Sequence, residues 1–179
     1  MFTNILTRGA ALFASVTTSG LLLASMLLPQ NVEPAVAAPA FQMPVTCGQS
    51  WTGTTFTNHN PLYAVDLNRA NDYGDNVLAS ADGTITRIAN LGDSSYGRYM
   101  IIDHGGGWQT LYAHLSGTYG REGAFVSRGT RIGLVGDSGN VTGTHLHYEQ
   151  RLNGSAVQIV FNGARIVYYT SQTLTSHNC

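Results

Sequence analysis

Short segments in which apolar and polar residues alternate, separated by strong turn signals, run from about residue 41 to the end of the chain. In residues 63–68, for example, Tyr, Val and Leu alternate with Ala, Asp and Asn. This two-residue period is that of a β-strand with one buried face. Comparable segments cover residues 76–79, 84–88, 99–103, 108–114, 131–135, 144–150, 156–160 and 165–169. Because no stretch beyond residue 41 shows the 3.6-residue apolar period of a helix, we expect an all-β domain with few or no helices.

The turn signals indicate antiparallel pairing of neighbouring strands. Asp82–Gly83, Gly105–Gly107 and Asn153–Gly154 each lie between two expected strands, and Asn-Gly and Asp-Gly dipeptides favour tight hairpin turns. The 21 glycines and the low share of charged residues, 11%, are also typical of a turn-rich β protein. A chain of 179 residues without an internal repeat fits a single compact antiparallel domain.

The first 38 residues are of a different kind and predict a signal peptide. Arg8 and a largely apolar stretch over residues 9–28 precede a segment rich in Ala and Pro, in which Ala35-Val-Ala37 fits a small-x-small cleavage pattern. The alternative is an uncleaved membrane anchor, because the apolar run is about as long as a bilayer core. Either interpretation places the expected domain, residues 39–179, outside the cytoplasm.

The charges and the cysteines narrow the class of protein further. The chain has 10 acidic and 9 basic residues, with a formal net charge of −1. Nucleic-acid binding needs a basic surface that this composition does not supply, so we expect no nucleic-acid partner. Cys47 and Cys179 bracket the expected domain. In an exported protein an even number of cysteines favours a disulfide, with two free thiols as the alternative.

The pattern His145-Leu146-His147 is the first in the chain that indicates a metal-binding or catalytic site. On a strand, residues two apart point to the same face, so the two imidazoles project side by side. Two such rings could form half of a metal site, or place one ligand beside one base. The alternative is a polar strand face in contact with solvent.

Three further residues carry side chains that suit a metal site. Asp66 lies on the polar face of its expected strand, and His59 precedes it in the chain. His114 ends the strand 108–114, whose alternation places Leu111 and Ala113 on the other face. Three imidazole and carboxylate ligands, with a fourth position open to water, are the pattern of a catalytic zinc site. Spacing alone leaves open whether these groups converge.

Six short motifs in a fixed order resemble the lysostaphin/LytM-type peptidoglycan metalloendopeptidases, a group that includes the β-lytic enzymes. Each motif is weak alone, but the ordered set across residues 59–151 is specific. The motifs are His59…Ala64-Val-Asp66, Val77-Leu-Ala-Ser-Ala-Asp-Gly83, Tyr96-Gly97, Tyr112-Ala-His-Leu115, Gly129-Thr-Arg-Ile-Gly133 and Gly143-Thr-His-Leu-His-Tyr-Glu149.

The resemblance implies one zinc ion per chain, held by His59, Asp66 and His147, with His145 and His114 as catalytic histidines. His145 would take the proton of the attacking water, and His114 would donate a hydrogen bond to the oxyanion, although the two roles are exchangeable. One feature departs from the family. Its common form places the first His and the Asp closer together than His59 and Asp66, an interval that the β-lytic branch tolerates.

Other reactive side chains receive weaker assignments. We expect His104, at a turn, to be structural and His177 to lie in solvent. Glu149 shares a strand face with the histidine pair and is either a carboxylate that orients an imidazole or a solvated side chain. Ser138 lacks the Gly-x-Ser-x-Gly spacing of a serine nucleophile.

These observations predict a secreted, cell-wall-associated zinc endopeptidase that cuts a cross-bridge or stem peptide of bacterial peptidoglycan in an active-site groove. We expect a monomer with no stable membrane association after signal cleavage. One alternative is a catalytically inactive relative that binds the wall or activates another hydrolase. Another is a zinc carboxypeptidase or amidase that acts on the same polymer. Inactive relatives lack one or more of the five site residues, which this chain retains.

Overall fold

The computed structural model describes residues 36–179, so nearly all of the expected signal peptide lies outside the described residues. The described part consists of strands, turns and loops and contains no helix, which confirms the all-β prediction. It therefore also contains no helix that could cross a membrane. The strands are β1 (Ser50–Thr54), β2 (Val65–Asn68), β3 (Asn76–Leu78), β4 (Gly83–Asn90), β5 (Arg98–Gly105), β6 (Trp108–Ala113), β7 (Gly117–Thr118), β8 (Phe125–Val126), β9 (Arg131–Leu134), β10 (Leu146–Leu152), β11 (Ser155–Val157), β12 (Val160–Phe161), β13 (Ala164–Arg165) and β14 (Ser171–Thr175).

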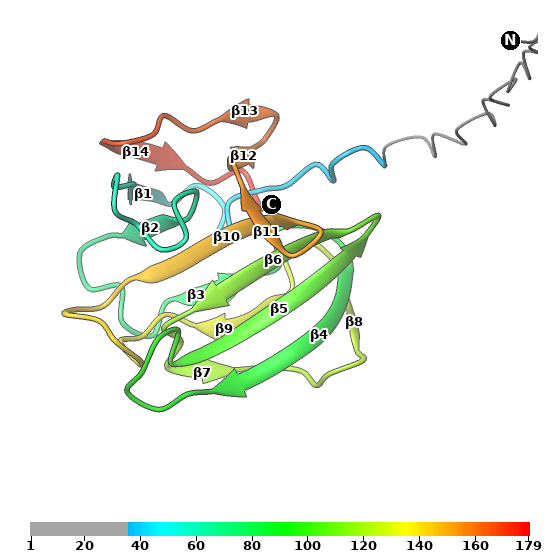
Figure 1. Cartoon of the computed structure of the whole chain (residues 1–179), viewed down its shortest axis with the longest axis horizontal. Helices are drawn as coiled ribbons and strands as arrows, with labels where there is room; N and C mark the ends of the chain where they lie inside the picture. Colours follow the sequence, from blue (N-terminus) through cyan, green and yellow to red (C-terminus); the bar gives the residue numbers. More distant parts are fainter. Residues whose placement is uncertain (1–35) are drawn as a thin grey trace, which may run out of the picture. The chain divides into compact units, whose positions relative to one another are not determined.

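The strands pair in antiparallel fashion and form three sheets (Figure 1). The largest has the order β14-β1-β2-β10-β6-β5-β4-β8, and β11 pairs with the end of β10. A second sheet has the order β3-β9-β7, and β12 pairs with β13. Within the large sheet, β10 is paired on both edges, with β2 on one side and β6 on the other. Side chains on this central strand are therefore fixed by two neighbouring strands.

The core lies between the large sheet and the β3-β9-β7 sheet. Val77 of β3 and Ile132 of β9 belong to the same buried cluster as Ile85, Met100 and Tyr112 of the large sheet. Removing such side chains from water stabilises the fold by roughly 25 cal/mol per Å² of apolar surface. Because apolar residues fill the inner face of the large sheet, the residues that alternate with them point to its outer face.

Two of the three expected hairpins are present. Gly105–Gly107 joins β5 to β6, and Asn153–Gly154 joins β10 to β11. Both residues of the second turn have positive φ, 50° and 82°, as a type I′ turn requires. The hairpin expected at Asp82–Gly83 is wrong, because β3 and β4 belong to different sheets. Where the chain passes from the sheet of β3 to the sheet of β4, Asp82 accepts a hydrogen bond from the main-chain nitrogen of Arg128 (2.7 Å).

The C-terminal region also differs from the prediction. The strand expected over residues 165–169 is wrong, because the chain leaves its pairing after β13. Tyr168 instead packs its ring on Tyr63, accepts a hydrogen bond from the Ile159 amide (2.8 Å) and donates one to the Tyr63 carbonyl (3.2 Å). The large sheet ends in β14, which pairs with β1, and neither strand was expected.

Cys47 and Cys179 form a disulfide across a sequence separation of 132, as predicted. Cys47 precedes β1 and Cys179 follows β14, so the bond ties together the segments that flank two paired strands. Hydrogen bonds support the same junction, because Ser176 donates its hydroxyl to the Val45 carbonyl (2.7 Å). The disulfide thus holds the N-terminal segment and the C-terminus of the described part against the same edge of the domain.

Candidate metal centre and groove

Strand pairing places Asp66 beside His147. The two residues are register partners on β2 and β10. They point to the outer face of the large sheet, because the adjacent Leu67 and Leu146 are buried in the inner face. The Oδ1 atom of Asp66 lies 3.1 Å from the Nδ1 atom of His147. The fold therefore brings two of the expected ligands, which are 81 positions apart, into direct contact.

His59 reaches the same carboxylate from the loop between β1 and β2. Its Nε2 atom lies 3.2 Å from the Oδ1 atom of Asp66. Its ring packs edge-on against His147, with ring centroids 5.1 Å apart. The candidate ligand atoms of the three residues all lie within 4.8 Å of one another. The long interval between His59 and Asp66 is thus taken up by a loop and does not prevent convergence.

The contacts of His147 call for a positive charge at the centre of this group. Its Nδ1 atom faces Asp66, and its Nε2 atom lies 3.0 Å from the Oε1 atom of Glu149. A neutral imidazole has one N–H and can donate to only one of two ionised carboxylates. The other contact would then join two acceptors. A second proton on the ring, or a cation between His147 and Asp66, removes this conflict.

The pKa directions agree with two ionised carboxylates. Burial raises the pKa of Asp66, but hydrogen bonds from His147 and His59 outweigh it and hold that pKa well below its usual value. Burial likewise raises the pKa of Glu149, but hydrogen bonds from its neighbours lower it overall. Burial lowers the pKa of His147, whereas its two carboxylate partners raise it overall. A partly buried site with this excess of negative charge favours a bound cation.

The donor set and its spacing fit zinc. Two imidazoles and one carboxylate, with a fourth position open, are the usual ligands of catalytic zinc. Tetrahedral ligands at about 2.0–2.1 Å from zinc lie about 3.3 Å from one another. The Oδ1 atom of Asp66 is 3.2 Å from the nitrogen of His59 and 3.1 Å from that of His147. The Asp66 oxygen is therefore at about the spacing from both imidazole nitrogens that a shared zinc ion requires.

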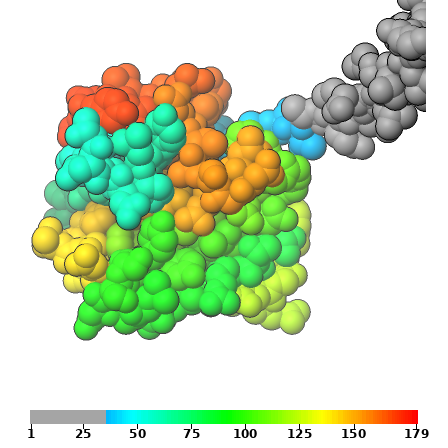
Figure 2. Space-filling model, viewed as in Figure 1, coloured from blue at the N-terminus to red at the C-terminus, as the bar shows by residue number. Residues whose placement is uncertain are grey.

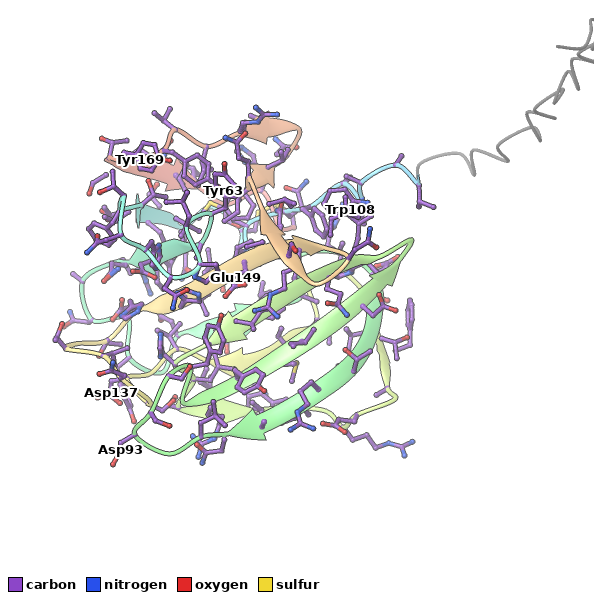
Figure 3. All side chains as sticks on the ribbon, in the orientation of Figure 1. Tyr63, Asp93, Trp108, Asp137, Glu149 and Tyr169 are labelled. Carbon is purple, nitrogen blue, oxygen red and sulfur yellow. A yellow bond between two sulfur atoms is a disulfide. The ribbon has the colours of Figure 1, made fainter. Side chains whose placement is uncertain are left out.

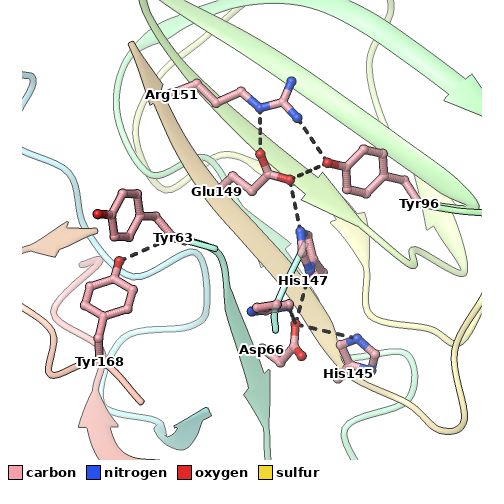
Figure 4. Close-up of polar contacts among 9 residues, drawn as sticks. Tyr63, Asp66, Tyr96, His145, His147, Glu149, Arg151 and Tyr168 are labelled. Atoms are coloured by element: carbon pink, nitrogen blue, oxygen red, sulfur yellow. Dashed lines mark hydrogen bonds and ion pairs between the residues drawn. The ribbon is translucent and has the colours of Figure 1, made fainter. Parts of the chain in front are cut away.

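Glu149, whose place on the sheet is labelled in Figure 3, connects His147 to two more side chains on the outer face (Figure 4). Its Oε1 atom also accepts a hydrogen bond from the Tyr96 hydroxyl (2.7 Å), and its Oε2 atom accepts one from the Arg151 Nε atom (2.7 Å). Burial and the bond to Glu149 raise the pKa of Tyr96 to about 12. Glu149 is 0% exposed, so the solvated alternative is wrong and the carboxylate orients the imidazole.

His145 and His114 lie next to the three candidate ligands. The Nε2 atom of His145 is 3.8 Å from the Oδ1 atom of Asp66, and the rings of His145 and His114 are 4.7 Å apart. His145 lies immediately before β10, where an isolated bridge to Gly136 holds it. The structure thus brings together the five residues that the sequence singled out. His145, which was expected within a strand, lies one residue before the start of β10.

His114 reaches the outer face by a local change of backbone conformation. Its predecessor Ala113 is the register partner of His147, so regular alternation would turn His114 toward the core, as it does Tyr112. The expectation that Leu111 and Ala113 lie on the opposite face from the site is therefore wrong, because they are the register partners of Glu149 and His147. His114 has φ 61°, a left-handed conformation that is uncommon for a residue other than glycine. Its ring consequently lies 5.6 Å from that of His147.

Each of these two histidines donates its Nδ1–H to a main-chain carbonyl. The Nδ1 atom of His114 is 2.8 Å from the Ser138 oxygen, and that of His145 is 3.0 Å from the Gly143 oxygen. Because a carbonyl only accepts, each neutral ring keeps its lone pair on Nε2. Burial is the main reason that the pKa of His114 is lowered, to about 4, despite the bond to Ser138. The neutral form of His114, with its lone pair on Nε2, is therefore favoured.

The five residues line one groove with a volume of about 720 Å³. The loops β1–β2, β4–β5 and β9–β10 contribute its other lining residues, and all three loops gather on the face seen in Figure 2. These residues are Asn60, Ser95, Tyr96, Asn140, Val141 and Thr142. Most of them are small and polar, so the groove suits an extended polar chain better than an apolar ligand.

His104 and His177 lie outside this groove. His104 is bonded through both ring nitrogens, with Nδ1 2.7 Å from the Asp82 carbonyl oxygen and Nε2 2.8 Å from the Thr110 hydroxyl oxygen. Its ring also packs edge-on against Phe41. His177 is exposed in the C-terminal tail. Both positions agree with the structural and solvated roles expected for them.

Sequence reasoning assigned no role to Tyr96 or Arg151. The alternation that links His145, His147 and Glu149 continues to Arg151, so the same two-residue period would have placed it on the outer face. Tyr96 belongs to one of the six motifs, but no local period predicts its contact with Glu149, which is 53 positions away in the sequence.

Comparison with protein families supports the interpretation of these motifs. The model described as "Peptidase family M23" matches residues 61–159. The chain belongs to peptidase family M23. The M23 match includes four of the five site residues and begins just after His59, the residue whose spacing departs from the common form of the family.

Several M23 relatives are similar to parts of this chain. The DD-carboxypeptidase/endopeptidase Mpg of Neisseria meningitidis serogroup B is 45% identical over 106 residues, covering 57% of this chain and 24% of that protein. The peptidoglycan DD-endopeptidase ShyA of Vibrio cholerae is 44% identical over 84 residues, covering 47% of this chain and 19% of that protein. The crystal structure of a zinc-containing peptidase from Vibrio cholerae has a TM-score of 0.56 and 28% identity, covering 66% of this chain and 38% of that one. The chain thus spans less than a quarter of the length of the two curated relatives.

Proposed function

We propose that this M23 protein is a zinc-dependent endopeptidase that hydrolyses peptide bonds in bacterial peptidoglycan. The observation that carries the proposal is the contact of His147 with two carboxylates, Asp66 and Glu149, because it calls for a positive charge in the group, which a zinc ion would supply. The match to peptidase family M23 supports hydrolysis of a peptide bond. The names of the Mpg and ShyA relatives support a peptidoglycan substrate.

We assign His59, Asp66 and His147 as the ligands of one zinc ion per chain. When bound, zinc lowers the pKa of a water molecule toward neutrality and polarises the carbonyl of the scissile peptide. Glu149 accepts the Nε2–H of His147, which leaves the Nδ1 lone pair directed at the other two ligands. The Nδ1 atom of His59 is buried without a hydrogen-bond partner in the described part of the chain, so its Nε2 contact is what orients the ring.

We assign the proton transfers to His145 and His114. The Nε2 atom of His145 is 3.8 Å from Asp66 and would take the proton of the attacking water, then deliver a proton to the leaving amine. The Nε2 atom of His114 would take up a proton from solvent as negative charge develops on the oxyanion and would donate it in a hydrogen bond to that oxygen. Both rings are held as the same tautomer by carbonyl oxygens, so the two roles are exchangeable on this geometry.

A carboxypeptidase acting on the same polymer is the second candidate, because the name of the Mpg relative includes both activities. The endopeptidase remains the first candidate, because the names of both the ShyA and the Mpg relatives include that activity. The hypothesis of an inactive relative loses support, because the five residues that such a relative would lack converge in this chain.

We further propose that the enzyme is secreted and associated with the cell wall. On this proposal, residues 1–38 are a cleaved signal peptide and residues 39–179 are a monomeric catalytic domain without stable membrane association. The disulfide between Cys47 and Cys179 supports export, because such bonds persist in oxidising compartments.

The proposal is tested by mass spectrometry of the fragments that the protein releases from purified peptidoglycan, with zinc measured in the same preparation. We expect one zinc per chain, loss of hydrolysis on chelation, recovery with added zinc, and new amino termini within cross-links or stem peptides. Release of single C-terminal residues alone would support the carboxypeptidase. Zinc-loaded, folded protein without any product would support the inactive relative, and full activity without a metal would contradict the proposed mechanism.

A further inference from the structure

The hydroxyl of Ser138 completes the hydrogen bonding between Arg98, the first residue of β5, and Leu115, which follows β6. The Leu115 amide donates directly to the Arg98 carbonyl (2.9 Å). In a regular hydrogen-bonded pair, two residues exchange both main-chain bonds. Here the second bond runs through a side chain: the Ser138 Oγ atom accepts the Arg98 N–H (2.9 Å) and donates to the Leu115 carbonyl (2.9 Å). The hydroxyl proton is therefore engaged, and Ser138 is not poised as a nucleophile.

The main-chain oxygen of the same residue holds the ring of His114. It accepts the Nδ1–H of His114 at 2.8 Å. His114 directly precedes Leu115, so Ser138 contacts both the ring of His114 and the backbone next to it. A neutral His114 ring held in this way carries its proton on Nδ1 and keeps the Nε2 lone pair for the groove.

The position of Ser138 is itself fixed by a close approach between two loops. Gly97 and Gly139 both have positive φ and pack backbone against backbone, and a Cβ on either residue would collide with the other loop. The Asn140 amide also donates to the Ser95 carbonyl (3.0 Å). The loop that carries Ser138 therefore has little freedom to move away from His114.

We propose that Ser138 is a positioning residue for His114, which it fixes in the left-handed backbone conformation and with its Nδ1–H bound, so that Nε2 is the atom that gains and gives up a proton in the proposed reaction. The backbone of His114 leaves regular strand geometry at φ 61°, a conformation that needs support from its surroundings. The hydroxyl of Ser138 gives that support at the adjacent residue, and its carbonyl selects the tautomer. This proposal rests on the proposed function, since it concerns a histidine assigned to proton transfer.

The test compares Ser138→Ala with a matched control, Ser176→Ala, in the zinc-loaded mature protein. The hydroxyl of Ser176 makes the same kind of bridge, because it donates to the Val45 carbonyl (2.7 Å) and accepts the Asn178 amide (3.2 Å). It lies next to the disulfide and outside the groove. Each variant therefore loses one donated and one accepted hydrogen bond. Ser138→Ala loses them beside His114, whereas Ser176→Ala loses them outside the groove.

We expect Ser138→Ala to lower kcat on soluble cross-linked peptidoglycan fragments by up to about 100-fold, with KM and zinc content unchanged, because misplacing a catalytic group has effects of this size. Ser138→Thr, which keeps the hydroxyl, should recover most of the rate, and Ser176→Ala should keep wild-type kcat. Wild-type kcat in Ser138→Ala would overturn the proposal. An equal loss in Ser176→Ala, or a loss that follows zinc release, would also overturn it.

A second readout is independent of activity. The ¹⁵N chemical shifts of His114 report its tautomer, and we expect Nδ1–H alone in the wild type. We expect a mixture of both tautomers in Ser138→Ala, because loss of the hydroxyl bonds to Arg98 and Leu115 frees the neighbouring backbone of His114 to move its ring away from the carbonyl, which the variant retains. If the wild type hydrolyses nothing, these shifts still decide the role of Ser138, and a single unchanged tautomer in the variant would contradict it. If Ser138→Ala does not fold, Ser138→Cys takes its place, because a thiol is similar in shape and is a weaker donor and acceptor.

Discussion

The Oδ1 atom of Asp66 lies 3.1 Å from the Nδ1 atom of His147, its direct partner across the β2–β10 ladder. The same oxygen is 3.2 Å from His59 and 3.8 Å from His145, so three imidazoles approach one carboxylate oxygen. The two expected ligands, His59 and His147, are thus closer to this oxygen than the expected base, His145. This ordering leads to opposite expectations for His147 and His145, although they are two residues apart in sequence.

Replacing a ligand should have a different effect from replacing a base. We expect His147→Ala to lose both zinc and activity. We expect His145→Ala to keep zinc and to slow the chemical step by about 100- to 10,000-fold, the usual range for general acid–base catalysis. His114→Ala should resemble His145→Ala. Zinc content and turnover measured on the three variants, with folding checked by circular dichroism, test these expectations. Retention of zinc by His147→Ala together with its loss from His145→Ala would reverse the two assignments.

Glu149→Gln should weaken zinc binding without removing a ligand. The amide keeps the size of the side chain but lacks the charge that accepts the Nε2–H of His147. Carboxylates in this position usually contribute about 10- to 100-fold to metal affinity. Competition with a chromophoric chelator measures the change. Asp75→Asn is the control, since it makes the same substitution in a carboxylate paired with Arg69 outside the groove. Equal affinities for all three proteins would show that Glu149 does not support the site.

The stability of the domain should decrease at mildly acidic pH because of His104. Burial lowers the pKa of this ring below the ordinary value of 6.5 in the folded state. At higher pH the ring is neutral in both the folded and the unfolded chain. As the pH falls below 6.5, the unfolded chain takes up a proton that the folded chain resists, so the free energy of unfolding falls until the lowered pKa is reached.

Urea denaturation as a function of pH measures this contribution. His104→Gln should have a shallower decrease than the wild type between pH 6.5 and the lowered pKa. His177→Gln is the matched control, because it removes a histidine from the exposed tail without altering the bonds of His104 to Asp82 and Thr110. An identical pH dependence in His104→Gln and wild type would exclude His104 as its source.

Removing the disulfide should destabilise the domain substantially. The bond between Cys47 and Cys179 closes a loop with a sequence separation of 132. The chain-entropy model gives about 5 kcal/mol as the upper limit of the effect on a loop of this length. The midpoint of urea unfolding of the Cys47→Ser/Cys179→Ser variant, compared with that of the oxidised wild type, tests this. Equal midpoints would show that hydrogen bonds such as that of Ser176 to Val45 hold the junction unaided.

The local pattern of residues was enough to predict the all-β class and one face of the site. The alternation of apolar and polar residues has a period of two, which is a local property of an extended chain. It therefore predicted that His145, His147 and Glu149 share a face, and it would have placed Arg151 there too. Asp66 and His59 were assigned as zinc ligands from the ordered motifs, because composition and spacing did not show whether these residues converge.

The pairing of distant strands, and the points where the local pattern breaks, depend on the folded structure. Asp66 and His147 become neighbours because β2 pairs with β10, a contact between residues 81 positions apart. His59 reaches them through a loop, and β3 and β4 separate into two sheets despite the turn signal between them. Regular alternation would have turned His114 into the core, and its ring reaches the site because the left-handed backbone is held by Ser138, 24 positions later in the chain. Such pairings depend on register and packing between distant segments, which no local period encodes.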